Sequence, residues 1–143
     1  MEKITILIVE DDGILAASLE ATLAALGYRP LRPVATGEEA EQVAAGEQPD
    51  LILMDVGLAG AINGVEAARR IHAKCDIPIV FLTGYSQDPS TRPAKGAFPH
   101  GYLVKPVPER ELTAAIEMAL YRHVLDRQVR NREEGLRTLI ENV

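Results

Sequence analysis

Residues 4–9 read Ile-Thr-Ile-Leu-Ile-Val and lead directly into three acidic residues at positions 10–12. This run is short, apolar and rich in β-branched side chains, which is typical of a strand covered on both faces in a parallel sheet. Three similar runs follow along the chain, at residues 51–54, 79–82 and 101–104. Residues 28–34 are a further candidate. Because Pro30 and Pro33 lack an N–H, we expect that strand at an edge of the sheet.

Helical periodicity fills the segments between these runs. Apolar side chains recur at three- and four-residue spacing over residues 14–26, and Gly27 ends the pattern. Thr36, with Glu39 three residues later, resembles a capping box and predicts a helix that ends near Gly46. The spacing of apolar residues predicts two more helices, over residues 65–72 and from Pro108, in the first turn, onward.

Strands that alternate with helices predict a doubly wound α/β fold, in which helices cover both faces of a parallel sheet. One segment departs from this alternation. Residues 86–100 contain three prolines, so we expect a loop there with at most one or two helical turns. Ligands of such sheets bind beyond the carboxyl ends of the strands. The residues that end each strand are therefore the first candidates for a functional site.

Composition limits the classes of function. The chain has 143 residues, the size of one domain, and its 15 Lys and Arg against 21 Asp and Glu give a formal net charge of −6. This acidic balance argues against direct binding of nucleic acid. The single cysteine, Cys75, excludes an internal disulfide. We find no apolar run long enough to cross a membrane and no signal peptide, so we expect a cytoplasmic protein without membrane contact.

Charged and hydroxyl side chains gather at the predicted strand ends: Glu10, Asp11, Asp55, Thr83 and Lys105. Two like unit charges about 5 Å apart repel by roughly 3 kcal/mol at an effective dielectric constant of about 20. Clustered carboxylates must therefore raise their pKa values or bind a cation, and oxygen ligands without His or Cys suit Mg²⁺. A carboxylate beside Mg²⁺ can attack a phosphoryl group. Lys105 and the Thr83 hydroxyl are of the types that stabilise the phosphoryl oxygens.

Four segments that end these strands resemble, in this order, the receiver domain of two-component response regulators: ILIVEDD (6–12), DLILMD (50–55), VFLTG (80–84) and GYLVKP (101–106). The resemblance covers residues 1–122 and implies a five-stranded flavodoxin-like sheet in the order 2-1-3-4-5. It implies a signalling module rather than a metabolic enzyme. A sensor histidine kinase or phosphotransfer protein would phosphorylate it, with Mg²⁺, and the change in conformation would control an output domain or partner.

The resemblance also implies the chemistry of individual residues. Asp55 matches the phosphoacceptor, and Lys105 matches the lysine that pairs with the phosphoryl group. Mg²⁺ would be bound by Asp55, directly by Asp11, through water by Glu10, and by the backbone carbonyl of Gly57.

Two further residues match the conformational switch of the family. Thr83 matches the hydroxyl that turns toward the phosphoryl group, and Tyr102 matches the aromatic side chain that moves inward with it. A half-buried core tyrosine is the alternative interpretation for Tyr102. The bond before Pro106 is often cis in the family. One departure is Ala59, where most receivers have proline, followed by a loop that resembles receivers of multidomain sensor proteins.

Residues 123–143 are expected to form a C-terminal helical extension. A heptad-like seam with one polar position runs along it at 4-3-4-3-4 spacing: Leu125, Val129, Arg132, Leu136, Leu139 and Val143. An isolated helix of this length needs partners, so we expect a homodimer contact here, with a solvated single helix as the alternative. The segment from Ala119 onward resembles linkers to a following PAS sensor domain. We therefore expect the chain to be the N-terminal piece of a longer protein.

Three rival functions can be weighed on the same residues. A phosphatase with Asp55 as transient nucleophile would need a second Asp two residues later, where Gly57 stands. A flavodoxin-like cofactor binder would need a Gly-rich phosphate loop after the first strand, where acidic residues stand instead. A receiver-like scaffold that has lost phosphorylation is disfavoured by the complete set of acceptor residues.

Overall fold

The computed structural model describes residues 2–58, 60–84 and 101–141, with side chains described as far as Gly135. One five-stranded parallel sheet has the order β2-β1-β3-β4-β5, which confirms the predicted doubly wound α/β fold. The strands are β1 (Thr5–Val9), β2 (Arg29–Pro30), β3 (Leu51–Asp55), β4 (Ile79–Thr83) and β5 (Gly101–Val104).

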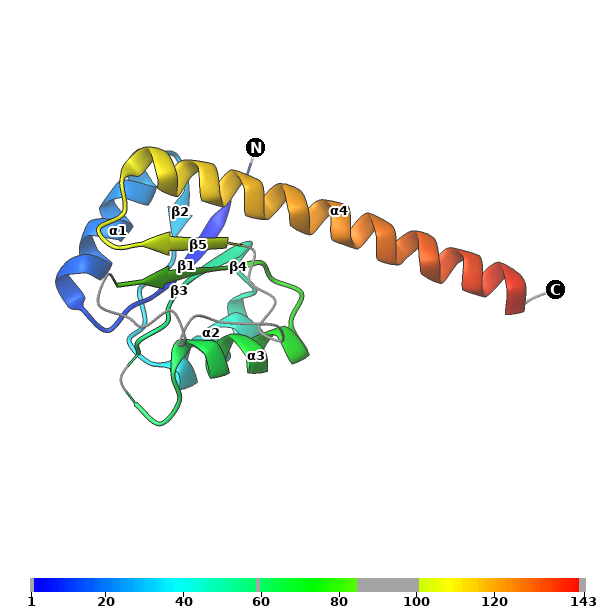
Figure 1. The fold of residues 1–143 in the computed structure, drawn as a ribbon, viewed down its shortest axis with the longest axis horizontal. Coiled ribbons are helices and arrows are strands. Elements are labelled where there is room, and N and C mark those ends of the chain that lie inside the picture. Colours follow the sequence, from blue (N-terminus) through cyan, green and yellow to red (C-terminus); the bar gives the residue numbers. More distant parts are fainter. Residues whose placement is uncertain (1, 59, 85–100, 142–143) are drawn as a thin grey trace.

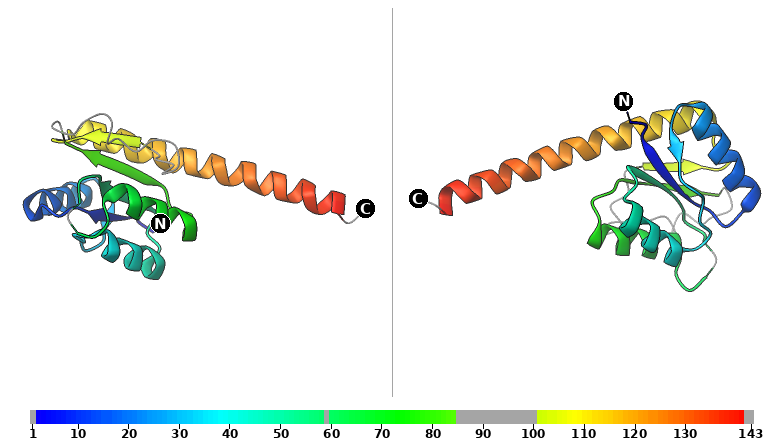
Figure 2. Two further views of the ribbon diagram at one scale, coloured as in Figure 1. Left: turned by 60° about the horizontal axis from the view of Figure 1, so that its bottom comes forward. Right: turned by 180° about the vertical axis from the view of Figure 1, so that it is seen from behind.

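Helices cover both faces of the sheet (Figure 1). In the described part of the chain they are α1 (Gly13–Ala25), α2 (Gly37–Glu47), α3 (Gly64–Lys74) and α4 (Glu109–Glu141). α2 and α3 lie against one face, and α1 and the first part of α4 lie against the other (Figures 1 and 2). The loop expected at residues 86–100 lies outside the described residues.

Strand residues contribute alternately to two apolar cores. In β1, Leu7 and Val9 pack in the core beneath α2 and α3, whereas Ile6 and Ile8 pack beneath α1 and α4. All four side chains are fully buried. Because both faces of the sheet are covered, the strands are continuously apolar rather than alternating, as the sequence predicts.

The edge position predicted for residues 28–34 is confirmed. β2 is the outermost strand of the sheet on the β1 side. The Arg29 N–H donates to the Ile4 carbonyl at 2.8 Å, and the Leu31 N–H donates to the Ile6 carbonyl at 2.9 Å. Pro30 lies between these two donors, at a position where the sheet needs no N–H.

Side chains begin the helices where local chemistry predicts. The Thr36 hydroxyl accepts the Glu39 N–H at 3.2 Å at the start of α2, as the capping box predicts. α3 begins at Gly64, one residue before the expected position, because the Asn63 side chain accepts the Glu66 N–H at 2.9 Å. Pro108 precedes α4 rather than lying in its first turn, and its carbonyl accepts the Leu112 N–H.

The C-terminal helix is one continuous element. α4 runs for 33 residues, so the expected domain boundary between residues 122 and 123 falls within a single helix. A helix of that length measures about 50 Å, and its second half extends past the edge of the sheet (Figures 1 and 2). None of the helices in the described part of the chain has the length and hydropathy needed to cross a membrane.

Gly64 lets α3 start directly against the end of β3. An ideal Cβ at this position would lie 1.9 Å from the Asp55 carbonyl oxygen, so a side chain would push backbone against backbone. We expect Gly64→Ala to lower the free energy of unfolding by about 3 kcal/mol or more, measured by urea denaturation. Gly46→Ala is the matched control, since no atom lies within 4 Å of its ideal Cβ, and it should be neutral or stabilising by up to about 1 kcal/mol. Equal stabilities for the two variants would contradict the close approach.

Candidate functional site

The parallel register brings the predicted residues to one edge of the sheet. Across neighbouring strands, Val9 pairs with Met54, Asp55 with Leu82, and Thr83 with Val104. Glu10 follows the last residue of β1, and Lys105 follows the last residue of β5. Four of the side chains singled out in the sequence therefore come from four adjacent strands.

Three carboxylates form the centre of this edge. One carboxylate oxygen from each of Glu10, Asp11 and Asp55 lies within 4.8 Å of the other two. Glu10 and Asp55 are each only 3% exposed, whereas Asp11 is exposed. The Gly57 N–H donates to Asp55 Oδ1 at 3.2 Å, and the Asp12 N–H donates to Glu10 Oε2 at 3.3 Å. Backbone groups thus hold the two buried acids, and the third acid faces solvent.

Lys105 lies between the two buried acids. Its Nζ is 2.6 Å from Glu10 Oε1 and 3.1 Å from Asp55 Oδ1. The Lys105 backbone N–H donates to the Thr83 carbonyl at 2.7 Å, which ties the lysine to the end of β4. The peptide bond between Lys105 and Pro106 is cis, as the resemblance implies.

The electrostatics of the cluster follow from burial. Loss of water around Glu10, together with the hydrogen bond and charge of Asp55, raises the pKa of Glu10 to about 7 against the opposing effect of Lys105. Burial alone would lower the pKa of Lys105, but its bonds to Glu10 and Asp55 outweigh burial and raise that pKa. The site therefore keeps its one ammonium and remains short of positive charge.

The predicted switch residues differ in their surroundings. Thr83 is buried at the end of β4, with 5% of its surface exposed. Tyr102 lies on β5 with 43% of its surface exposed, and its ring stacks on Phe81 with centroids 6.0 Å apart. More than half of the Tyr102 surface is therefore covered, and both its switch role and the alternative of a half-buried core residue stay predictions. Gly57 is exposed beside Asp55, and a metal-binding role for its carbonyl stays a prediction.

The donor set fits a hard divalent cation. All three clustered ligand groups are carboxylates, the type that Mg²⁺ takes together with water and phosphate oxygens. Burial and the neighbouring Asp55 raise the pKa of Glu10, so a cation at this position would stabilise the ionised carboxylate. Asp11, as the exposed member, gives such an ion a side open to water. The residues present therefore fit Mg²⁺ without rearrangement of the strands that carry them.

Sequence reasoning missed the direct contact between Glu10 and Lys105, since it paired the lysine only with a phosphoryl group. Asp12, the third acid of the 10–12 run, instead caps α1, because its side chain accepts the N–H groups of Ile14 and Leu15. No residue type or spacing signals the Glu10 contact, because 95 residues separate the partners.

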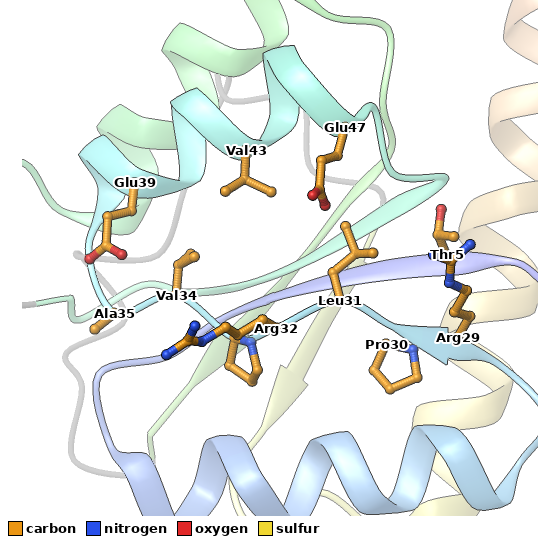
Figure 3. A pocket seen from close by; sticks show the side chains of 11 residues that line it. Thr5, Arg29, Pro30, Leu31, Arg32, Val34, Ala35, Glu39, Val43 and Glu47 are labelled. Atoms are coloured by element: carbon orange, nitrogen blue, oxygen red, sulfur yellow. The ribbon is translucent and has the colours of Figure 1, made fainter.

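A concave region lies away from this cluster. A hollow of about 880 Å³ opens between the edge segment 29–35 and α2, and Figure 3 shows the side chains around it. Apolar Leu31, Val34 and Val43 line it together with charged Arg32 and Glu39. It contains none of the three clustered carboxylates, so it does not bear on the chemistry at the strand ends.

Comparison with known proteins places this site in a family. The model of the response regulator receiver domain matches residues 6–117. The chain is 35% identical over 138 residues to the transcriptional regulatory protein PdtaR of Mycobacterium tuberculosis, which covers 96% of this chain and 65% of PdtaR. It is 36% identical over 118 residues to AfsQ1 of Streptomyces coelicolor, which covers 82% of this chain and 52% of AfsQ1. The chain thus spans between half and two thirds of the length of these curated relatives.

Solved structures agree. The signal receiver domain of a modulated diguanylate cyclase from Desulfovibrio desulfuricans G20 is 44% identical, with a TM-score of 0.81, and the match covers 87% of this chain and 99% of that one. The N-terminal domain of a response regulator/sensory box/GGDEF 3-domain protein from Carboxydothermus hydrogenoformans is 33% identical, with a TM-score of 0.78, over 85% and 98% of the two chains. From the family match over most of its length, the chain belongs to the response regulator receiver domain family, a family of signalling domains.

Proposed function

We propose that Asp55 accepts a phosphoryl group in a Mg²⁺-dependent reaction and that this modification switches the conformation of the domain. The observation that carries the proposal is the contact of Lys105 with Asp55 inside a cluster of three carboxylates. A lysine and a hydroxyl beside a buried carboxylate are the groups that phosphoryl transfer requires around its charged oxygens.

In the proposed reaction an Asp55 carboxylate oxygen attacks phosphorus. The new oxygen–phosphorus bond forms as the bond from phosphorus to a histidine nitrogen of the partner kinase, or to the leaving group of a small phosphodonor, breaks. The Gly57 N–H, which donates to Asp55 Oδ1, orients the carboxylate. Lys105 keeps its proton throughout, because its pKa is raised, and pairs with the phosphoryl oxygens.

Mg²⁺, when bound by Asp55, Asp11, the Gly57 carbonyl and Glu10 through water, would neutralise charge on the phosphoryl group and on the acids. The side chains and backbone groups around the ion would position Lys105 and the acids. Glu10 holds Lys105 at 2.6 Å, and the Asp12 N–H holds the Glu10 side chain. These contacts keep the ammonium within reach of Asp55 before any phosphoryl group arrives, which reduces the reorganisation that the reaction requires.

The proposed switch uses Thr83 and Tyr102. The phosphoryl group would offer Thr83 a hydrogen-bond acceptor, and the movement of this buried residue would leave room for the exposed Tyr102 ring to turn inward past Phe81. Such a contact shifts the equilibrium between two conformations only by its difference in free energy between them.

The proposed partners are a sensor histidine kinase or phosphotransfer protein and an output domain. The relatives named above include the receiver of a diguanylate cyclase and the first domain of a three-domain protein with a sensory box. By analogy, we propose that residues 1–122 act as the receiver and that residues 123–143 lead to a further domain such as a PAS or GGDEF domain. Cytoplasmic localisation stays a prediction from the sequence.

We also propose that α4 pairs with a second copy of the chain. Met118, Tyr121, Leu125 and Val129 are all exposed on this helix, with 41% of Leu125 and 54% of Val129 accessible. Their spacing continues in the sequence through residues 132–143. A row of exposed apolar side chains on a helix that extends past its domain suits helix pairing with an identical row.

The phosphoacceptor role is tested by beryllofluoride with Mg²⁺ and by a small phosphodonor. The wild-type protein should form an adduct with beryllofluoride and gain the mass of one phosphoryl group, and Asp55→Asn should do neither. Asp12→Asn is the matched control, because it removes the same charge next to the site while Asn still caps α1. A wild-type protein that takes up neither group is a scaffold rather than a phosphoacceptor. Turnover of phosphomonoesters would favour the phosphatase.

The metal role is tested through stability. In EDTA, Asp11→Asn should raise the free energy of unfolding by about 1 kcal/mol, because it removes repulsion from an exposed acid near Glu10 and Asp55. With saturating Mg²⁺ the wild type should gain stability and Asp11→Asn should gain little, as measured by urea unfolding. Asp12→Asn should respond to Mg²⁺ as the wild type does. An equal gain for wild type and Asp11→Asn would remove Asp11 from the ligand set.

Pairing of α4 is tested by sedimentation velocity over a range of protein concentrations. Leu125→Lys should weaken self-association at least about tenfold, since it places a charge in the apolar row. Asn131→Lys, which adds the same charge at an exposed position about 120° around the helix from that row, should leave association unchanged. A wild-type protein that stays monomeric at all concentrations, with and without beryllofluoride, would rule out the pairing.

A further inference from the structure

Asp76 contacts two arginines and a histidine of α4 at the edge of the sheet opposite to Asp55. It lies between the end of α3 and the start of β4. Its Oδ1 is 2.9 Å from Arg130 Nη2, and its Oδ2 is 3.5 Å from Arg127 Nε and 3.7 Å from His123 Nε2. One carboxylate therefore contacts three consecutive inward-facing positions of the helix.

These three positions share one face of α4, because they are four and three residues apart. They also lie beyond the part of the helix that packs on the domain. Ala119 and Leu120 are the last α4 side chains in either apolar core, among the residues that the structure describes. From there on, ionic contacts with Asp76 replace apolar packing as the link between the helix and the receiver domain.

The histidine in this group is well covered, since only 12% of the His123 side chain is exposed. Burial would raise the pKa of Asp76, but the hydrogen bond from Arg130 and the charges of His123, Arg130 and Arg127 outweigh burial and lower it. The carboxylate therefore stays charged at neutral pH.

We propose that Asp76 is a positioning residue that holds residues 123–130 of α4 against the receiver domain, beyond the point where apolar packing ends. Leu125 and Val129 lie about 200° and 240° around the helix from His123, at 100° per residue. With residues 123, 127 and 130 held inward, the apolar row must point to solvent, as its exposure shows. The use of that row by a second copy rests on the proposed pairing of α4. The contact of residues 123–130 with Asp76 does not depend on that pairing.

Cys75 offers a direct probe of this contact. It is the only cysteine of the chain, is half-buried, and lines a hollow of about 740 Å³ with Leu120, Val124 and Arg127 of α4. When residues 123–130 move away from the domain, the thiol becomes more accessible. The rate of its reaction with a neutral maleimide therefore reports how often this part of the helix detaches.

The decisive variant is Arg127→Gln/Arg130→Gln, which removes two of the three side-chain contacts with Asp76. Without these contacts residues 123–130 should detach more often, so the thiol should react faster. We expect an acceleration of about fivefold, the scale on which removing two exposed ion pairs shifts a local equilibrium. The matched control is Arg110→Gln/Arg122→Gln, two exposed arginines of the same helix, which should react as the wild type does.

Hydrogen exchange of the peptide that covers residues 121–131 gives a second readout, and it should be faster in the decisive variant and unchanged in the control. Urea unfolding shows that each variant is folded, and Arg130→Gln alone replaces the double variant if that one is not. The measurements use unphosphorylated protein at a concentration where it sediments as a monomer, so failure of the phosphoacceptor or pairing proposals leaves them interpretable. A decisive variant that reacts no faster than the wild type, or exchange that is unchanged, would overturn the role of Asp76.

Discussion

Repulsion between carboxylates at the ends of two parallel strands is the constraint around which the rest of this structure is arranged. Glu10 and Asp55 are buried side by side, Asp11 stands next to them, and one ammonium, that of Lys105, lies among them. Three acids share one base here, and burial of Glu10, together with the neighbouring Asp55, raises its pKa to about 7. Such a site is costly for an empty domain and favourable for one that binds a divalent cation and a phosphoryl group.

The carboxylates stay close together despite their repulsion because the sheet beneath the cluster is tightly packed. Both faces of β3 are packed, and Asp55 is the last residue of that strand. Gly64 then brings the start of α3 against the Asp55 carbonyl, closer than any side chain would permit. Packed cores resist small displacements, so the carboxylates cannot separate to relieve their repulsion. The same rigidity presents them in a defined geometry to a ligand.

Local patterns were enough to predict the strands, the edge position of β2, the cap at Thr36 and the meeting of Asp55 with Lys105. Each depends on residue type and period, or on the rule that parallel strands end at one edge. The contact between Glu10 and Lys105 and the burial of His123 against Asp76 were not predictable in this way. They depend on how side chains from distant segments pack in three dimensions. The local sequence around Asp76 would be the same whether its carboxylate faced solvent or paired with α4.

The two charged clusters lie at opposite edges of one sheet and share β4. This strand begins three residues after Asp76 and ends at Thr83, whose carbonyl holds the backbone of Lys105. From Lys105 the chain enters α4 four residues later and runs back across the sheet until Arg127 and Arg130 meet Asp76. The segment that leaves the edge of the sheet near Asp55 therefore contacts the domain again at the opposite edge. A helix that contacts the domain at both points would move as a rigid body when the sheet changes conformation. A helix held only at its start could bend instead, and the movement would not reach its far end.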